Sequence, residues 1–292
     1  MGRRLAAEHR VARETMEEAD AALGSSLSRL CFDGPDADLI RTENAQPAIL
    51  AVSIAAWRAL VKEIDLRPSW LAGHSLGEYT ALVVAGALAF DDALRLVRLR
   101  GRLMQSATPP GVGAMAAIVG LAEDRVATLC RDGALDEIVA PANFNGAGQI
   151  VIAGHRAAVK RVAERARAAG GRARELSVSA PFHCALMGPA VAGLASALAD
   201  VAVAPLRTPI VTNVEADLND DAGRVRELLV AQLTAPVRWA ESMQLLWRLG
   251  CGRAFEIGPG QVLTRLLQRM ELGIEAIAAG EGERWAALAG VA

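Results

Sequence analysis

The stretch WLAGHSLGEY, residues 70–79, contains the pattern G-x-S-x-G, with Ser75 between two glycines. A short apolar run precedes the pattern and EYTALVVAGALA follows it, so we predict a sharp turn between a buried strand and a helix. Gly73 and Gly77 allow this serine turn (residues 73–77) because they carry no Cβ. The free N–H groups at a helix start favour an oxyanion, and the Leu76 N–H is the expected donor.

Ser75 has two interpretations at this position. It is either a nucleophile or only the N-cap of a buried helix, and the flanking strand and helix favour the nucleophile. A serine nucleophile needs a base. Three of the four histidines are expected to serve otherwise: a solvated His9, His74 pointing away from the serine, and His155 capping a surface helix. By elimination His183, in SAPFHCALM, is the predicted base, and the alternative is a packed loop histidine.

The residues around His183 do not complete a familiar triad. Cys184 is predicted to be a buried structural thiol, because no second histidine lies near it in the sequence. The four cysteines are far apart and include no C-x-x-C pair, so we expect neither a metal site nor a disulfide framework. No acidic residue flanks His183, so the spacing does not identify the group that orients its imidazole.

The helix predicted over LRLVRLRGRLMQ, residues 94–105, carries a charge on its apolar side. Three of its arginines share one face, as a solvated face requires: Arg95, Arg98 and Arg102. Arg100 lies opposite them among aliphatic side chains, where an unpaired charge is costly. Its partner is either a carboxylate of the protein or the carboxylate of a ligand, held by two hydrogen bonds.

Periodicity divides most of the chain into helices and short strands. Helices are predicted at residues 3–23, 45–63, 77–88 and 91–106, and buried strands at residues 69–72, 208–213 and 253–257. Strands that alternate with helices favour a mainly parallel sheet covered on both faces. Together with the serine turn, this pattern predicts an α/β fold with an α/β-hydrolase-like large subdomain.

A second unit is predicted after the sequence TPPGVG at residues 108–113. A strand at 114–120, a helix at 122–132, two strands within 137–154, a helix at 155–170 and a strand at 172–180 follow one another. This β-α-β-β-α-β order is typical of a ferredoxin-like unit. We therefore predict a small ferredoxin-like subdomain over residues 111–178, inserted into a large subdomain of residues 1–110 and 179–292. The cleft between them is the expected ligand site.

The composition limits the class of protein. The 292 residues carry a formal net charge of −2, which argues against a nucleic-acid partner, and 52% hydrophobic against 4% aromatic residues predict an aliphatic core. The longest apolar stretches, around residues 46–57 and 80–90, are too short to span a bilayer. The charged N-terminal segment lacks the apolar core of a signal peptide. We expect a cytoplasmic protein that does not bind a membrane.

Seven motifs follow one another along nearly the whole chain: GHSLGEY, LRGRLMQ, GAMAAIVGL, ANFNGAGQIVIAG, SAPFHCALM, AQLTAPVRW and FEIGPGQVL. In these motifs and their order the chain resembles the malonyl-CoA:acyl-carrier-protein transacylases of bacterial fatty acid synthesis. The related acyltransferase domains of polyketide synthases share most of them. The resemblance implies that the serine takes malonyl from malonyl-CoA as an ester and that the phosphopantetheine thiol of acyl carrier protein then collects it. CoA is the leaving group in this scheme, and no metal or bound cofactor is implied.

The resemblance also implies roles for single residues. Ser75 resembles the nucleophile, His183 the base, and Arg100 the arginine that pairs with the malonyl carboxylate. Gln232, in AQLTAPVRW, matches the glutamine whose backbone carbonyl orients the histidine in place of an acid. Phe182 resembles the residue found in malonyl-selecting polyketide acyltransferases, which predicts a preference for malonyl over methylmalonyl.

One feature of the family has no counterpart in the sequence. Members open with a strand and a loop that reads roughly FPGQGSQ, whose glutamine lies at the oxyanion site. The opening MGRRLAAEH, residues 1–9, resembles the segment that follows this loop. We therefore expect the sheet to lack one central strand and the site to lack one oxyanion donor, a loss that lowers rates by a factor on the order of 10²–10³.

Other functions are compatible with parts of the pattern. A discrete acyltransferase that loads a polyketide synthase carrier uses the same chemistry, a hydrolase or thioesterase uses the same serine turn, and a non-catalytic scaffold keeps only the fold. Arg100 argues against a hydrolase of neutral esters, whose acyl pocket needs no charge. His183 also argues against it, because more than 100 residues follow it and hydrolases usually have this histidine late in the chain, after an acid. One active site within one chain predicts a monomer.

Overall fold

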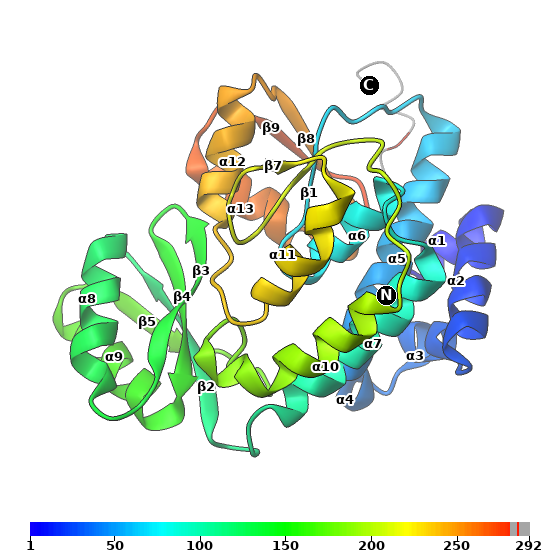
Figure 1. Cartoon of the computed structure of the whole chain (residues 1–292). Coiled ribbons are helices and arrows are strands. Elements are labelled where there is room, and N and C mark those ends of the chain that lie inside the picture. The colour runs from blue at the N-terminus through cyan, green and yellow to red at the C-terminus, as the bar shows by residue number, and fades with distance from the viewer. Residues whose placement is uncertain (281–284, 286–292) are drawn as a thin grey trace.

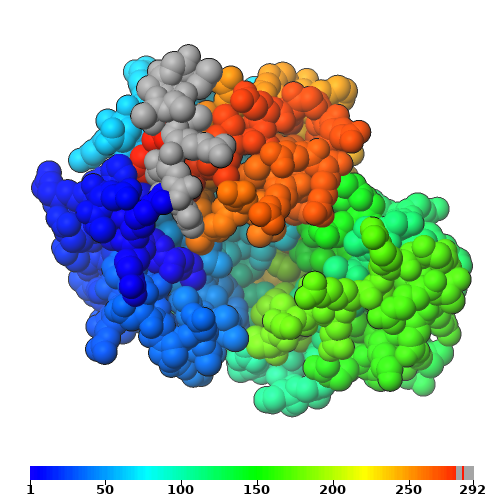
Figure 2. All heavy atoms as spheres, turned by 180° about the vertical axis from the view of Figure 1, so that it is seen from behind, coloured from blue at the N-terminus to red at the C-terminus, as the bar shows by residue number. Residues whose placement is uncertain are grey.

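The computed structural model describes residues 1–280 and residue 285. A large unit built mainly of helices and a smaller unit built on a four-stranded sheet lie side by side (Figure 1). The mixed α/β class predicted from the alternating pattern is therefore confirmed. From behind, the surface is hollowed between the blue N-terminal helices and the green smaller unit (Figure 2).

The helices of the large unit pack around one aliphatic core, as the alanine-rich and leucine-rich composition predicts. They are α1 (Arg3–Glu8), α2 (Arg10–Leu23), α3 (Leu27–Asp33), α4 (Asp36–Leu39), α5 (Thr42–Glu63), α6 (Leu76–Val84), α7 (Phe90–Ser106), α10 (Gly188–Ala199), α11 (Val225–Ala231), α12 (Trp239–Arg248) and α13 (Val262–Met270). Short 3₁₀ turns at Ala185–Met187 and Ala222–Arg224 precede α10 and α11. The helices α5 and α7 form the centre of this core, which fixes where α7 presents Arg100.

The first predicted helix is interrupted. His9 has an extended backbone, with φ −120° and ψ 115°, and it separates α1 from α2. The expectation that His9 is solvated is wrong, because its side chain is only 21% exposed and its ring lies 4.9 Å from that of Trp285. This contact between distant segments has no signal in the local sequence pattern.

The strands of the large unit are shorter than predicted and do not form one sheet. β1 (Leu71–Ala72), β6 (Ile210–Val211) and β7 (Leu218–Asn219) form one sheet, and β8 (Arg253–Glu256) and β9 (Glu275–Ala278) form another. The pairs β1–β6 and β8–β9 are parallel, whereas β7 is antiparallel to β6. Most strand pairs of the described large unit are thus parallel, as predicted, but its strands form two sheets instead of the one sheet expected. A hydrogen-bonded turn between Thr212 and Asp217 ends β6 early and reverses the chain into β7.

The smaller unit follows the predicted order of elements. It comprises β2 (Gly113–Val119), α8 (Glu123–Ala134), β3 (Val139–Gly146), β4 (Gln149–His155), α9 (Arg156–Ala168) and β5 (Arg172–Glu175). The strands are antiparallel neighbours in the order β3-β4-β2-β5. β5 is shorter than the predicted strand, because after Glu175 the chain leaves the sheet and residues 177–179 line a cavity. His155 precedes α9 but does not cap it, since its Nδ1 accepts the Ile138 N–H at 2.9 Å.

The two faces of the small sheet have different neighbours. One face packs against α8 and α9, and the other contributes to a cluster that includes Phe182 and Cys184 of the large unit. Backbone hydrogen bonds from Phe144 to Val237 and from Val237 to Ala142, both 2.9 Å, join β3 to the large unit. The small sheet therefore supports the segment that carries His183.

Among the residues that the structure describes, no helix is both long enough and apolar enough to cross a bilayer.

Candidate active site

The serine turn holds Ser75 in a conformation that side chains rarely adopt. Ser75 has φ 53° and ψ −105°, and its side chain makes no capping hydrogen bond to α6. The N-cap interpretation therefore does not account for its hydroxyl. Instead, Ser75 Oγ lies 2.7 Å from His183 Nε2, and the Ser75 N–H donates to Asn213 Oδ1 at 2.6 Å. A strained residue at a helix start is typical of a functional site.

His183 is buried and bonded at both ring nitrogens. It is 4% exposed, and its Nδ1 lies 2.9 Å from the backbone oxygen of Gln232. A carbonyl only accepts, so Nδ1 carries the proton and the Nε2 lone pair faces Ser75. Burial and, secondarily, the charge of Arg100 lower the pKa of His183 to about 3, so the imidazole is neutral and free to accept a proton at pH 7.

Arg100 is buried without a carboxylate partner. It is 2% exposed, and none of the ion pairs in the described part of the chain includes it. Its Nη1 donates to Gln46 Oε1 at 2.7 Å, and its Nη2 donates to Gln232 Oε1 at 2.8 Å and to Ser75 Oγ at 3.1 Å. Two partners were considered for this guanidinium, a carboxylate of the protein and a carboxylate of a ligand. No protein carboxylate in the described part of the chain pairs with it.

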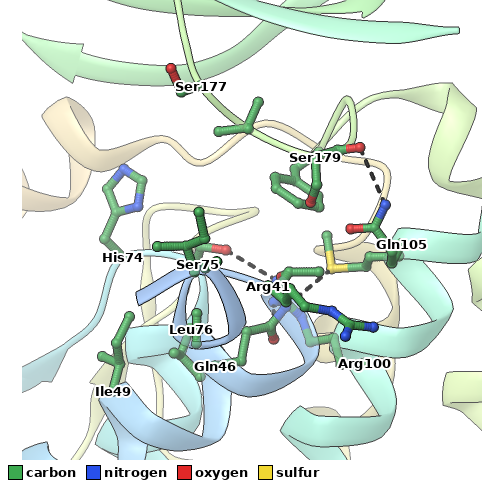
Figure 3. Close-up of a pocket in the computed structure, with 17 residues that line it drawn as sticks. Arg41, Gln46, Ile49, His74, Ser75, Leu76, Arg100, Gln105, Ser177 and Ser179 are labelled. Atoms are coloured by element: carbon green, nitrogen blue, oxygen red, sulfur yellow. Dashed lines mark hydrogen bonds between the residues drawn. The ribbon is translucent and has the colours of Figure 1, made fainter. Parts of the chain in front are cut away.

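A cavity of about 560 Å³ opens at this cluster. Figure 3 shows Ser75, Gln46 and Arg100 turned toward one another at its floor. Its lining comes from α4 and α5, from the serine turn, from α7 and from residues 177–182. Several apolar side chains at its rim are exposed: Ile40, Ile49 and Val178. The cavity thus offers an elongated acyl group a path from an apolar rim to a hydroxyl and a positive charge.

The remaining predicted residues lie in or beside this cavity. Leu76 lines it, and its N–H, at the first position of α6, makes no hydrogen bond to the described residues. Phe182 lines it next to His183. His74 also lines it, but its Nε2 lies 2.9 Å from Asn145 Oδ1 of the smaller unit, and burial lowers its pKa. His74 is thus held away from a role as the partner of Ser75.

Cys184 is buried and far from ionisation. It is 2% exposed, its Sγ donates to the Pro181 carbonyl at 3.1 Å, and burial raises its pKa to about 11. A thiol in this state is a poor nucleophile. No group of three or more histidine, cysteine or acidic side chains suited to a metal ion occurs in residues 1–280 or at residue 285.

Three buried polar side chains at the site were not predicted: Gln46, Glu78 and Asn213. Gln46 contacts Arg100, and Asn213 contacts Ser75. Glu78 contacts Asn213 and Gln232. A signal existed for Glu78, because it is the one charged residue in the apolar run that follows the serine turn. Gln46 and Asn213 have no comparable signal, since uncharged amides are common on surfaces.

The fold and this site have known relatives. A family model described as "Acyl transferase domain" matches residues 1–276, and the chain therefore belongs to the acyl transferase family. Its similar relatives include the malonyl CoA-acyl carrier protein transacylase of Salmonella typhimurium, 45% identical over 267 residues, which are 91% of this chain and 86% of that protein. The protein of the same name from Escherichia coli K12 is 44% identical over 284 residues, 97% of this chain and 92% of its own. The resemblance seen in the motifs is confirmed.

Solved structures agree with this result. One chain of a solved complex, described as a type II PKS acyl-carrier protein in complex with its malonyl-transacylase, matches with a TM-score of 0.96 and 43% identity, over 99% of this chain and 94% of that one. An acyl carrier protein S-malonyltransferase from Vibrio cholerae matches with a TM-score of 0.91 and 44% identity, over 94% and 90% of the two chains.

The two glycines of the serine turn make a matched pair for mutation. A Cβ on Gly73 would lie 1.9 Å from the Gly77 carbonyl group and 2.4 Å from the Glu78 nitrogen, whereas a Cβ on Gly77 would meet no atom within 4 Å. We predict that Gly73→Ala lowers the free energy of unfolding by about 3 kcal/mol or prevents folding. Gly77→Ala should be neutral or stabilise by up to about 1 kcal/mol. Urea denaturation measures both, and similar midpoints for the two variants would contradict the geometry.

The low pKa of His183 predicts a pH dependence of stability. The folded pKa of about 3 lies below the ordinary value of 6.5, so the unfolded chain binds this proton first as the pH falls. The resulting stability is fully present above pH 6.5 and is lost progressively toward pH 3. Between pH 7.5 and pH 5 we expect the wild type to lose about 2 kcal/mol more than His183→Gln in urea unfolding. Equal losses would show that His183 titrates normally.

Proposed function

We propose that the protein transfers a malonyl group from malonyl-CoA to the phosphopantetheine thiol of acyl carrier protein, through an ester on Ser75, in fatty acid synthesis. The observation that carries the proposal is Arg100, a buried guanidinium at the floor of the cavity. It donates to two glutamine side chains and, at 3.1 Å, to Ser75 Oγ, and no ion pair in the described part of the chain includes it. An acyl group with a free carboxylate supplies the missing anion. The names of the relatives agree with this substrate.

In the first step, Ser75 Oγ attacks the thioester carbonyl of malonyl-CoA while His183 Nε2 accepts the hydroxyl proton. The carbonyl π bond opens to an oxyanion, which the Leu76 N–H and the start of α6 stabilise. The oxyanion then collapses, the C–S bond breaks, and His183 returns its proton to the CoA sulfur. Ser75 is left as a malonyl ester, and CoA leaves as a thiol.

In the second step, the carrier's phosphopantetheine thiol gives its proton to His183 and its sulfur attacks the malonyl ester. The C–O bond to Ser75 breaks, and His183 protonates the serine oxygen. The Gln232 backbone carbonyl, bonded to His183 Nδ1, holds the imidazole in the tautomer that both steps need. A hydrolase uses the same residues with water, but it has no use for the charge of Arg100 in its acyl pocket.

A second candidate is a discrete acyltransferase that loads a polyketide synthase carrier. Two observations favour it: the likeness to a malonyl-transacylase in complex with a type II PKS acyl-carrier protein, and Phe182 beside His183. Phe182 is the residue to which we attribute a preference for malonyl over methylmalonyl. Transfer rates from both acyl-CoA esters to a fatty-acid carrier and to a polyketide carrier distinguish the two candidates.

We also infer a finer description of the protein. The large unit is α/β-hydrolase-like, for which the serine turn between β1 and α6 is the support. The smaller unit is ferredoxin-like, for which its strand order β3-β4-β2-β5 is the support. We infer a monomer, since every residue of the scheme comes from one chain. The scheme uses no metal or resident cofactor, and we assign the protein to the cytoplasm.

The covalent intermediate gives the first test of the function. Incubation with malonyl-CoA should add one malonyl group to the wild-type chain, and Ser75→Ala should remove this adduct in intact-protein mass spectrometry. Malonyl transfer to holo acyl carrier protein should fall by at least about 10³-fold, because the variant loses the hydroxyl that lies 2.7 Å from His183 Nε2. A full malonyl adduct on Ser75→Ala would exclude the assignment.

The choice of acyl group gives the second test. Arg100→Ala should lower kcat/KM for malonyl-CoA by about 10²-fold or more and raise transfer from acetyl-CoA, because the cavity loses the charge and gains apolar space. Arg102→Ala, on the exposed side of the same helix, serves as the control and should leave both substrates unchanged. Equal losses with both acyl groups would make Arg100 a structural residue only.

A further inference from the structure

Glu78 is a buried carboxylate that the proposed reaction does not use. It lies in the first turn of α6, three residues after Ser75, and is 1% exposed. None of the ion pairs in residues 1–280 includes it. A buried carboxylate without a cation at contact distance is costly, so its hydrogen bonds must compensate for lost hydration.

Glu78 accepts two hydrogen bonds, and both donors belong to residues of the active site. Glu78 Oε2 accepts the Asn213 backbone N–H at 3.0 Å and Gln232 Nε2 at 2.8 Å. The side chain of Asn213 in turn spans the serine turn, because its Oδ1 accepts the Ser75 N–H and its Nδ2 donates to the Gly73 carbonyl, both at 2.6 Å. Glu78 is thus the common acceptor for the two residues that touch the backbone of the serine turn.

The bond to Gln232 fixes which end of its amide faces Arg100. An ionised carboxylate only accepts, so the amide nitrogen of Gln232 must point to Glu78. The same nitrogen also donates to the Ser75 carbonyl at 3.1 Å. The amide oxygen is thereby turned to Arg100 Nη2, at 2.8 Å. The reverse orientation would set the amide N–H groups against the guanidinium N–H groups.

We propose that Glu78 is a positioning residue for acyl transfer, which through the side-chain amide of Gln232 holds Arg100 in place beside Ser75. The inference rests on the proposed function and deepens it. The side-chain amide of Gln232 lies between Glu78 and Arg100. The negative charge of Glu78 therefore compensates the charge of Arg100 without forming a direct ion pair with the guanidinium. The guanidinium is therefore held in place and still has its binding capacity for the carboxylate of the acyl group.

The ionisation of Glu78 sets the conditions of the test. Burial raises its pKa to about 7, while the hydrogen bonds from Gln232 and Asn213 and the charge of Arg100 oppose this rise. Assays at pH 8 therefore examine the ionised form.

The first experiment compares Glu78→Gln with wild type in single-turnover acylation by malonyl-CoA and by acetyl-CoA. The new amide still accepts from the Asn213 N–H, so the serine turn keeps its support, but it also donates, so Gln232 is free to turn over. We expect the malonyl rate to fall about 10–100-fold and the acetyl rate to change less than about threefold. Glu227→Gln is the matched control, because Glu227 is also the third residue of its helix but is exposed, and it should change neither rate.

A double-mutant cycle tests the path through Gln232. In the Gln232→Leu background, which keeps the backbone carbonyl for His183, Glu78→Gln should change the malonyl-to-acetyl ratio less than about twofold. Equal losses of both rates in the single variant, or an undiminished effect in this background, would overturn the proposal.

A crystal structure of Glu78→Gln decides the matter independently of activity. We expect the contact between Arg100 Nη2 and Gln232 Oε1, 2.8 Å in the wild type, to open beyond hydrogen-bond distance. An unchanged contact would overturn the positioning role even in an active enzyme. If the wild type itself forms no malonyl ester, the proposed function fails, and this structure still decides the role of Glu78.

Discussion

The burial of one guanidinium organises the active site. Arg100 extends from α7 into the centre of the large unit, where water does not compensate its charge. Two glutamine oxygens and the hydroxyl of Ser75 accept hydrogen bonds from its Nη1 and Nη2, and Glu78 supplies a negative charge on the other side of Gln232. Buried polar side chains therefore meet here from α5, from α6, from α7 and from the end of α11, although the core around them is aliphatic. Under the proposed function, the choice of acyl group and the arrangement of the buried polar side chains around Arg100 depend on the same charge.

The same charge acts on the base. Burial and, secondarily, the charge of Arg100 lower the pKa of His183, which keeps the imidazole neutral but also makes it a weak proton acceptor. Under the proposed function, the carboxylate of the acyl group offsets the charge of Arg100 at the moment of reaction. An acyl group without a carboxylate leaves the charge in place. Selection for malonyl then has two physical sources, direct pairing with Arg100 and a stronger base.

The sequence could predict the parts of this site that depend on local pattern. The serine turn is a short motif between a strand and a helix, and Arg100 contradicts the periodicity of its own helix, so both were found from a few neighbouring residues. Elimination points to His183 because the chain has only four histidines, and the structure places its Nε2 2.7 Å from Ser75 Oγ. Asn213 and Gln232 contact the serine turn from 138 and 157 residues away, and only the folded chain sets such contacts. The sheet was mispredicted for a related reason, because β1 and β6 have two residues each and their ends are fixed by tertiary hydrogen bonds.

The smaller unit matters to the chemistry although none of the proposed reacting groups belongs to it. Its sheet packs against Phe182 and Cys184, the two neighbours of His183, and its Asn145 binds His74, the neighbour of Ser75. Ser75 and His183 are 108 residues apart in the chain, and both have a positive φ, a strained backbone that must be held from outside. The small sheet contacts both segments at once, whereas Asn213 holds only the serine side. The 2.7 Å contact between Ser75 Oγ and His183 Nε2 therefore depends on the docking of the two units as much as on the serine turn itself.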